Sequence, residues 1–329
     1  MKLKCKKFSV VIVVAVMLST LIGTQFVSTA SAVSWQVITG KLGRANYRIR
    51  IPNNCDGDLV IYCRGYSPQV PTSWSPNSFN QLLNQGYMFA ESTYGKGGVC
   101  IKEGVIRTHQ LTEYILDHYP VTGKVLLLGI SMGGNIALQL GAKYPHLYDG
   151  VLDICGGKDS AAQYDDKMYY ASLTNDDDLI AALISKGSAV PPFPFVPPYF
   201  PPPLSDQLAA FREYCLTSGG DIAIACGGNT PEEKPKAYER ISPTFSAADI
   251  TIPTITVHGD KDGLVPYSQS IAFEAAVAAN GRLNLYRLYT VVGGEHANMA
   301  MLSKIPVCMP YLLDWVENGN PAPATPPWS

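Results

Sequence analysis

An apolar run that ends in a glycine-flanked serine constrains the fold of this chain more than any other feature. Residues 124–134 read Lys-Val-Leu-Leu-Leu-Gly-Ile-Ser-Met-Gly-Gly, and a helix-like segment follows at 135–144. Because the valine and leucines do not alternate with polar residues, they predict a strand buried on both faces, as in a parallel sheet covered by helices. Ser131 would then lie on a sharp strand-to-helix turn, where Gly129 and Gly133 prevent a clash. The turn is a candidate nucleophile elbow, and the alternative is an ordinary serine in a glycine-rich turn.

Strands alternate with helices along most of the remaining chain. Two short strands are expected within residues 35–52, and further strands at 58–63, 87–92, 150–155, 253–258 and 283–292. The expected helices cover residues 78–85, 102–119, 135–144, 268–279 and 310–317. This order predicts right-handed βαβ units and an α/β fold, with a mostly parallel sheet flanked by helices and the first two strands antiparallel at one edge.

A long insertion interrupts this alternation. The predicted core comprises residues 33–155 and 251–318, and the segment between them, 156–250, is far longer than the dozen or so residues of a normal crossover. We therefore expect a large cap insertion. The proline-containing end, residues 319–329, is predicted to be a flexible tail.

Prolines crowd one part of the insertion, residues 190–203. Eight of these residues are prolines and lack a backbone donor, so a stiff, polyproline-like segment is expected. The segment also carries four aromatic side chains, which are predicted to form an apolar substrate-binding wall: Phe193, Phe195, Tyr199 and Phe200. A solvated linker is the alternative.

The first 32 residues have the pattern of a secretory signal peptide. Four lysines precede an apolar core at residues 8–23, and Ala-Ser-Ala at 30–32 fits a cleavage site. A membrane anchor is the alternative, but the core is shorter than the roughly 20 residues of a spanning helix. We therefore expect a secreted protein, extracellular or periplasmic, without a stable membrane anchor after cleavage. Loss of four lysines and no acids would change the net charge from −2 to −6, which gives no electrostatic reason to bind nucleic acid.

Seven cysteines follow the predicted signal peptide, so at least one would stay unpaired if the others formed disulfides. Cys63 and Cys155 lie in apolar runs, where a free cysteine behaves as a small hydrophobic residue. Cys215 and Cys226 lie close together in a glycine-containing region, and they are the pair most expected to form a disulfide.

His296 is the predicted general base for Ser131. A serine hydroxyl is a poor nucleophile at neutral pH, so it needs a base within hydrogen-bonding reach and a third group that orients this base. His296 ends the sequence Gly-Gly-Glu-His directly after the last predicted strand, where it can reach the same edge of the sheet. The other four histidines are expected to have packing, surface or turn-forming roles: His109, His118, His146 and His258.

Asp262 is the predicted orienting acid. Residues 259–266 read Gly-Asp-Lys-Asp-Gly-Leu-Val-Pro directly after a predicted strand, so Asp260 and Asp262 both compete for this role. Asp260 is closer to the strand, where a short acidic side chain more often stabilises a turn through nearby backbone groups. Asp262 is therefore favoured, with Asp260 as the structural alternative.

The order Ser131, Asp262, His296 on alternating strands and helices resembles the α/β-hydrolase family. Residues 258–266 look like the acid turn of this family, and residues 148–156 are similar to secreted esterases related to feruloyl esterases and tannases. The His-Gly-Gly-Gly stretch of the hormone-sensitive-lipase branch is absent, and Arg-Gly-Tyr at 64–66 occupies the equivalent strand end. The resemblance implies an oxyanion hole formed by the backbone N–H groups of Met132 and Tyr66. A plain turn is the alternative for Tyr66.

These observations predict a serine hydrolase that cleaves carboxylic esters through an acyl-enzyme, with a small-molecule ester as its partner. No organic cofactor or metal is expected; the acidic residues 176–178 are predicted to form a solvated turn, with calcium binding as the alternative. Two alternatives remain for the function. One is a peptidase that uses the same three residues, and the other is a non-catalytic binding protein of the hydrolase fold.

Overall fold

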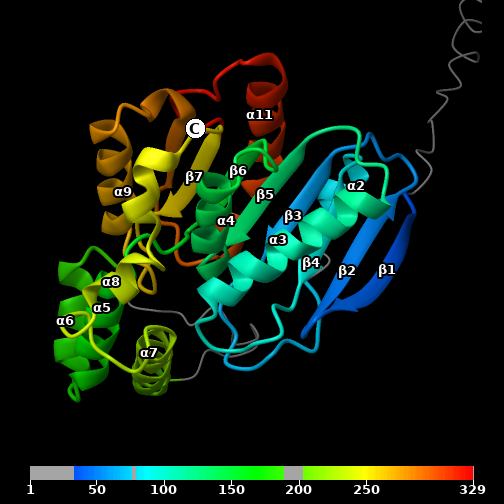
Figure 1. The fold of residues 1–329 in the computed structure, drawn as a ribbon. Helices are drawn as coiled ribbons and strands as arrows, with labels where there is room; N and C mark the ends of the chain where they lie inside the picture. Colours follow the sequence, from blue (N-terminus) through cyan, green and yellow to red (C-terminus); the bar gives the residue numbers. More distant parts are fainter. Residues whose placement is uncertain (1–32, 76–78, 189–202, 329) are drawn as a thin grey trace, which may run out of the picture. The chain divides into compact units, whose positions relative to one another are not determined.

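Eight strands form one sheet in the order β1-β2-β4-β3-β5-β6-β7-β8 in the computed structural model, which describes residues 33–75, 79–188 and 203–328 (Figure 1). From β1 to β8 the strands are Trp35–Leu42, Ala45–Pro52, Leu59–Cys63, Met88–Ser92, Val125–Ile130, Gly150–Ile154, Thr254–Gly259 and Tyr286–Val291. β1 pairs antiparallel with β2 and β2 with β4, and all later neighbours are parallel. The predicted mostly parallel sheet with an antiparallel edge is confirmed. The chain divides into two units, Met1–Val33 and Ser34–Ser329, and the architecture described is that of the second.

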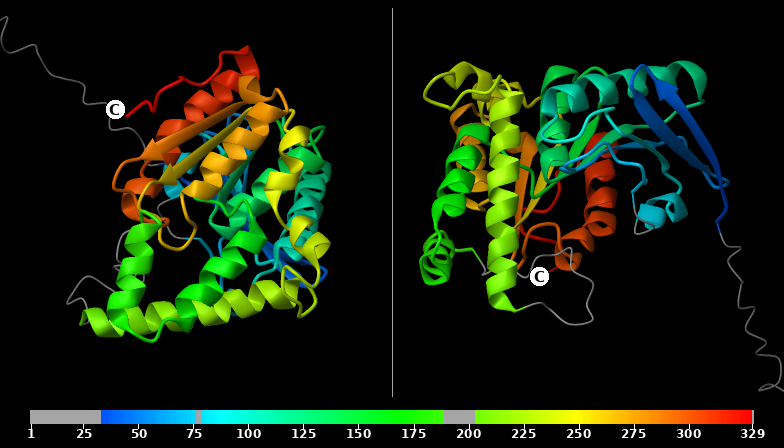
Figure 2. Two further views of the ribbon diagram at one scale, coloured as in Figure 1. Left: turned by 90° about the vertical axis from the view of Figure 1, so that its left-hand side faces the viewer. Right: turned by 90° about the horizontal axis from the view of Figure 1, so that it is seen from below.

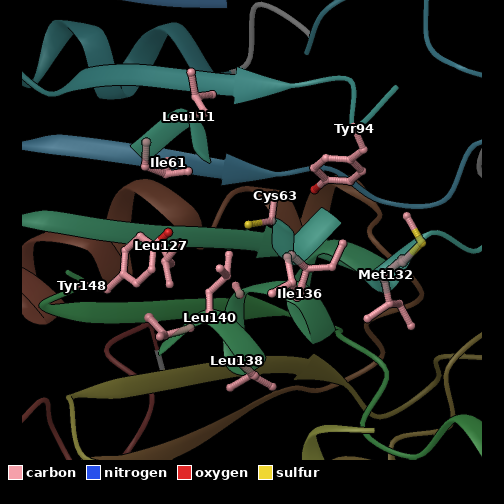
Figure 3. Packing of buried hydrophobic residues seen from close by; sticks show 14 of the residues in the cluster. Ile61, Cys63, Tyr94, Leu111, Leu127, Met132, Ile136, Leu138, Leu140 and Tyr148 are labelled. Carbon is pink, nitrogen blue, oxygen red and sulfur yellow. The ribbon is translucent and has the colours of Figure 1, made fainter. Parts of the chain in front are cut away.

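The central strands are buried on both faces, as their unbroken apolar sequences predict. Ile61 of β3 pairs with Leu127 of β5, and both side chains point to the face covered by α4, where they meet Ile136 and Leu140 (Figure 3). Leu126 belongs to the hydrophobic cluster on the opposite face. This alternation follows from the two-residue period of a strand, and it gives the sheet a core on each side.

Helices cover both faces of the sheet. α3 (Ile101–His118), α4 (Met132–Lys143) and α9 (Ser268–Ala279) contribute side chains to one hydrophobic cluster, and α3 and α4 lie in front of the strands in Figure 1. α2 (Asn80–Asn84), α10 (Met299–Leu302) and α11 (Ile305–Asn318) contribute to the cluster on the other face. A short 3₁₀ turn, η3 (Leu283–Leu285), leads into β8.

The closing helix α11 begins five residues before its predicted start at residue 310. Pro306 is tolerated because it lies in the first turn, where backbone N–H groups have no helical partner. Pro310 lies inside the helix, so the interpretation of this proline as a helix start was wrong.

The described part of the insertion is helical and has a small core of its own. It contains α5 (Ser160–Ser172), α6 (Asp176–Ser185), α7 (Leu204–Ala225), α8 (Pro235–Glu239) and the 3₁₀ segment η2 (Pro243–Asp249). α5 and α7 lie side by side (Figure 2), and a cluster of buried side chains from α5, α6 and α7 includes Tyr170, Leu183 and Phe211. The predicted solvated turn at residues 176–178 is instead the first turn of α6, where acidic side chains interact favourably with the helix dipole.

The predicted Cys215–Cys226 disulfide is wrong. Both thiols are free, as are the other described cysteines: Cys55, Cys63, Cys100, Cys155 and Cys308. Cys215 lies within α7 and Cys226 directly follows it, so their Cα atoms are separated by about 16 Å of helical rise, whereas a disulfide needs less than about 7 Å. The two side chains also belong to different hydrophobic clusters.

The C-terminal segment packs on the sheet, in contrast to the flexible tail that was predicted for residues 319–329. The Tyr289 hydroxyl donates to the carbonyl of Pro323 over 2.6 Å, and the Arg287 guanidinium donates to the carbonyl of Ala322 over 2.9 Å. Trp328 packs edge-on against the Tyr289 ring. Through these contacts the segment extends the cluster on the α11 face.

Candidate active site

Ser131 lies between β5 and α4 in a strained backbone conformation. Its φ is 58° and its ψ is −124°, a combination that L-residues rarely adopt. Its amide donates to the carbonyl of Ile154 over 2.9 Å, which attaches the turn to the neighbouring strand β6. The side chain therefore projects from the carboxyl end of the sheet, where ligands bind in parallel α/β folds.

The two glycines around Ser131 are required by close backbone contacts. A Cβ on Gly129 would lie 2.2 Å from the carbonyl oxygen of Gly133, and a Cβ on Gly133 would lie 1.9 Å from that of Cys63. Any side chain at either position would separate α4 from the sheet. The predicted reason for the Gly-x-Ser-x-Gly spacing is confirmed.

The structure brings the three sequence-predicted catalytic side chains together. The Ser131 hydroxyl lies 2.8 Å from Nε2 of His296, and Nδ1 of His296 lies 2.7 Å from Oδ2 of Asp262. Because Asp262 can only accept, Nδ1 carries a proton, and Nε2 of the neutral ring is free to accept from the serine. Asp262 is fully buried and His296 nearly so. The arrangement is that of a nucleophile, a base and a group that orients the base.

Asp262 accepts hydrogen bonds on both of its carboxylate oxygens. Oδ1 accepts from the amides of Leu264 and Val265, each over 2.9 Å, while Oδ2 accepts from His296 and from Nε2 of His258 over 3.1 Å. Burial alone would raise the pKa of this carboxyl, but the positive charge of protonated His296 and the histidine hydrogen bonds depress it below its usual range. The carboxylate is therefore ionised at neutral pH.

The same interaction acts in reverse on His296. Burial lowers the pKa of the imidazole, but the Asp262 carboxylate, helped by the Cys155 thiol, holds the pKa well above its ordinary value. Protonated His296 is stabilised at the point where a proton from Ser131 would arrive.

Asp260, the alternative acid, has a structural role. Its Oδ1 accepts from the amide of Gly293 over 2.7 Å, and among the described residues it forms no hydrogen bond or ion pair with His296. It thus connects the turn after β7 to the turn after β8. His109 and His118 stack on Tyr144 and Tyr114, which agrees with packing roles.

The groups proposed for the oxyanion hole lie next to Ser131. Met132 is the first residue of α4, so its N–H has no partner within the helix. Tyr66 follows Gly65, whose added Cβ would lie 3.4 Å from the Cβ of Ser131, and Tyr66 lines both cavities that reach the serine. The guanidinium of Arg64 donates to the Gly65 carbonyl over 3.1 Å, which polarises the N–H of Tyr66 in the same peptide unit.

Two cavities meet at Ser131. The larger, of about 540 Å³, is lined by Glu295, His296 and the residues that follow them, together with Phe79 and Tyr62. The smaller cavity, of about 40 Å³, lies against α5 and α7 of the insertion, and its lining includes Met132 and Lys167. The aromatic residues predicted to bind substrate lie outside the described residues, so that role stays a prediction: Phe193, Phe195, Tyr199 and Phe200.

Within the described residues, one group of side chains has metal-ligating atoms close together: Cys155, Asp262 and His296, with donor atoms within 4.8 Å of one another. Two of the three belong to the hydrogen-bonded chain from Ser131. A metal ion bound there would compete with the His296–Asp262 hydrogen bond, so the group fits the triad better than a resident metal.

Sequence reasoning missed the role of His258 in the site. This buried histidine was expected to shape a turn, but its Nε2 lies within 3.1 Å of both Asp262 and the Val265 carbonyl. Since both groups are acceptors, Nε2 carries the proton, and Nδ1 accepts from the Ser270 hydroxyl over 2.6 Å. Its position four residues before Asp262 was the available signal.

Comparisons with known proteins agree with this geometry. The model of an esterase family matches residues 106–167, which include Ser131, and the model of the prolyl oligopeptidase family matches residues 221–318, which include Asp262 and His296. The fold is similar to that of acylaminoacyl peptidase from Pyrococcus horikoshii, with a TM-score of 0.59, 14% identity and coverage of 88% of this chain. The chain has the α/β-hydrolase fold. The matches and the site together support a serine hydrolase.

Two other solved structures are similar to this chain over most of their own length. Est1E from Butyrivibrio proteoclasticus has a TM-score of 0.52 and 14% identity, covering 86% of this chain and 98% of its own. The esterase Pf2001 from Pyrococcus furiosus has a TM-score of 0.52 and 14% identity, covering 88% of each chain. By contrast, this chain spans 42% of the length of the acylaminoacyl peptidase and 35% of the length of a similar structure from Bacteroides ovatus. No curated protein sequence matches this chain.

No helix in the described part of this chain is both long enough and apolar enough to span a bilayer.

Proposed function

We propose that this serine hydrolase cleaves carboxylic esters through an acyl-enzyme formed on Ser131. The observation that carries the proposal is the continuous hydrogen-bonded chain from Ser131 through His296 to Asp262, with distances of 2.8 and 2.7 Å. These contacts allow the serine to become a nucleophile at the moment when its proton leaves.

In the first half-reaction, Oγ of Ser131 attacks the ester carbonyl while Nε2 of His296 takes the hydroxyl proton. The tetrahedral intermediate collapses, the bond to the alcohol oxygen breaks, and His296 returns the proton to that oxygen. In the second half-reaction, water gives a proton to His296 and attacks the acyl carbonyl, and Ser131 recovers its proton as the acid leaves. Asp262 stays ionised and orients the imidazole throughout.

The negative oxygen of each intermediate would be stabilised by the N–H groups of Met132 and Tyr66. Negative charge there also benefits from the positive end of the α4 dipole, because Met132 begins that helix. The donors are attached to the elbow and to the end of β3, so little reorganisation is needed when charge develops.

A peptidase activity is the second candidate, because the prolyl oligopeptidase model matches residues 221–318 and several similar structures are named as peptidases. The ester activity is favoured because the esterase-family model matches residues 106–167, the segment that carries the nucleophile Ser131.

A substrate screen tests the proposal. Purified protein without residues 1–32 is assayed against p-nitrophenyl esters of increasing acyl length, hydroxycinnamate esters and peptide p-nitroanilides. In parallel, a fluorescent alkyl phosphonate labels the active serine, and mass spectrometry locates the label. Ester turnover with labelling at Ser131 is expected; anilide cleavage without ester turnover would favour the peptidase, and neither turnover nor labelling would favour a binding protein.

We also propose that the protein is exported and acts outside the cytoplasm. The proposal depends on the lysine-rich start, the apolar core and the Ala-Ser-Ala sequence of residues 1–32. N-terminal sequencing of exported protein should find Val33 as the first residue, and retention of Met1 would contradict the proposal.

A further inference from the structure

The geometry of the triad decides which of the two cavities would receive the acyl part of an ester. His296 must give its proton to the departing alcohol, so the alcohol side lies next to this residue. The cavity of about 540 Å³ is lined by His296, while the cavity of about 40 Å³ is lined by Ser131 and Met132 but not by His296. The smaller cavity is therefore on the acyl side.

A buried lysine lines this acyl-side cavity. Lys167 of α5 has only 7% of its surface exposed. Its ammonium donates one long hydrogen bond, 3.3 Å, to the carbonyl of Leu264 and lies 4.8 Å from the centre of the Tyr214 ring. Among the described residues no carboxylate lies within ion-pair distance of it. A buried charge without an opposite charge is costly, and buried charges in proteins are normally paired or ligated, so an anionic ligand would supply the partner that the described residues do not.

Lys158 provides a comparison within the same molecule. It is also buried, but its ammonium lies 2.6 Å from Oδ2 of Asp153 and 2.6 Å from the carbonyl of Gly156. Lys158 thus has an anionic partner from its own chain, and its role is explained by the fold. Lys167 has a comparable degree of burial and lacks such a partner in the described structure.

A second polar group lies one helical turn before Lys167. Gln163 lines the same cavity, and residues four apart share one face of a helix. No side-chain hydrogen bond of Gln163 is formed with the described residues. An amide donor and an ammonium on one face of α5 therefore both border the acyl side of Ser131, and both can donate to a carboxylate.

We propose that the acyl-side cavity binds a short acyl group that carries a carboxylate, with Lys167 as the specificity-determining cation and Gln163 as an additional donor. The proposal rests on the proposed esterase function. The volume of the acyl-side cavity, about 40 Å³, has room for roughly three water-sized groups. This size favours an acyl chain of two methylenes and a carboxylate, as in a succinyl monoester. An aspartyl residue on the acyl side of a peptide bond places a carboxylate at the same number of bonds from the carbonyl.

The test compares two esters of nearly equal shape, monoethyl succinate and ethyl 4-methylpentanoate, in which two methyl groups replace the carboxylate oxygens. Initial rates are measured with the protein lacking residues 1–32. The wild type should prefer the succinate by at least about 10-fold in kcat/KM, and Lys167→Met should reduce this preference on the order of 10–100-fold, the range expected for a charged hydrogen bond. Lys186→Met is the matched control, because Lys186 is exposed and pairs with Asp166 on the outside of the insertion. It should keep the wild-type preference.

Assays with peptide substrates distinguish a carboxylate that belongs to an ester from one that belongs to an aspartyl residue. Acetyl-aspartyl and acetyl-leucyl p-nitroanilides are assayed with the same variants. A Lys167-dependent preference for the aspartyl anilide without ester turnover would support carboxylate binding but overturn the esterase. Turnover of both esters without preference for the succinate would overturn the acyl-site proposal and leave the esterase intact. If Lys167→Met fails to fold, the wild-type preference alone decides, and a ratio near one rejects the proposal.

Discussion

The phenol of Tyr66 donates a hydrogen bond to Oδ2 of Asp221 over 2.7 Å. Tyr66 follows the end of β3, where its N–H is a candidate oxyanion donor, and Asp221 belongs to α7 of the insertion. Burial, together with the Asp221 carboxylate, raises the pKa of the Tyr66 phenol above its ordinary value, so the phenol remains a donor across the working pH range. The insertion is therefore attached directly to the loop that borders the nucleophile.

Removal of this attachment should affect kcat more than KM. Asp221→Ala leaves the Tyr66 phenol without its acceptor and frees the loop. We expect kcat for a p-nitrophenyl ester to fall by about 10-fold, which is less than the loss caused by complete removal of one oxyanion donor. Asp221→Asn keeps an acceptor oxygen and should recover most of the loss. Steady-state kinetics of both variants test the idea, and equal loss in both would assign Asp221 a role other than holding Tyr66.

The triad makes a sharper prediction. Ser131→Ala and His296→Ala should each reduce ester turnover by several orders of magnitude, because the members act as a unit. Asp262→Asn should be similarly severe, whereas Asp260→Asn should be mild because Asp260 only connects two turns. Steady-state kinetics measure catalysis, and thermal melting shows whether each variant still folds. Near-wild-type activity in either alanine variant, or a larger loss of activity in Asp260→Asn than in Asp262→Asn, would contradict the assignment.

The pH profile should reflect the raised pKa of His296. The base acts only when neutral, so activity rises as pH increases through the pKa of the folded protein. The ordinary histidine pKa is about 6.5. In the folded protein the pKa of His296 is higher, because the Asp262 carboxylate outweighs burial. In kcat/KM against pH, the acid limb should therefore have its midpoint above about 6.5. A midpoint at or below that value would contradict this prediction.

The Asp262–His296 pair should also make the stability of the fold depend on pH, because the pKa of Asp262 is lowered on folding and the pKa of His296 is raised. Asp262 has a depressed pKa when folded, so its contribution is lost as pH falls through that value. His296 has a raised pKa when folded, so its contribution is complete below the unfolded value and is lost as pH rises through the folded one. The pair should stabilise most between about pH 4 and 6.5. Thermal melting of wild type and Asp262→Asn across pH should show the largest difference in that window.

The parts of the site that sequence could predict are those in which local geometry dictates the residue type. The elbow needs glycine at 129 and 133 because backbone atoms occupy the space that a side chain would need. The Gly-x-Ser-x-Gly spacing can therefore be recognised from the sequence alone. Similarly, Asp262 and His296 lie in the turns after β7 and β8, and the parallel order of these strands brings their carboxyl ends together.

Other parts depend on long-range contacts that no local pattern encodes. Lys167 lies on an ordinary-looking helix, and its burial results from packing of α5 against α7. The C-terminal segment has a composition typical of a flexible terminus, but Trp328 packs edge-on against the Tyr289 ring. Cys215 and Cys226 are close in sequence, but the intervening helix holds them apart.

His258 should contribute to both stability and turnover. His258→Leu leaves the Ser270 hydroxyl without its acceptor and removes one donor from Asp262, in a fully buried environment. We expect a loss of about 1–3 kcal/mol in the free energy of unfolding, since unpaired buried polar groups are costly. Because Asp262 orients the base, kcat should also fall. Urea denaturation and steady-state kinetics measure the two effects, and an unchanged free energy of unfolding would show that these bonds are dispensable.

A buried ion pair, formed by Lys158 and Asp153, lies behind the elbow. Oδ2 of Asp153 accepts from Lys158 over 2.6 Å and from the Thr256 hydroxyl over 2.9 Å, while Oδ1 accepts from the Gly156 amide over 3.0 Å. Oδ1 also lies where a side chain on Gly134 of α4 would project, so the pair is in contact with the helix that carries the nucleophile. Both side chains are completely buried.

Lys158→Met should leave an uncompensated buried carboxylate and destabilise the fold by about 3–5 kcal/mol, as measured by urea denaturation. The double variant Lys158→Met with Asp153→Asn removes both charges and keeps an acceptor oxygen and similar volume at position 153, so it should recover a large part of that loss. Lys186→Met breaks a partly exposed pair and should cost less than about 1 kcal/mol. If Lys158→Met is no less stable than Lys186→Met, or the double variant is the least stable of the three, the charge of the pair is not what holds α4 against the sheet.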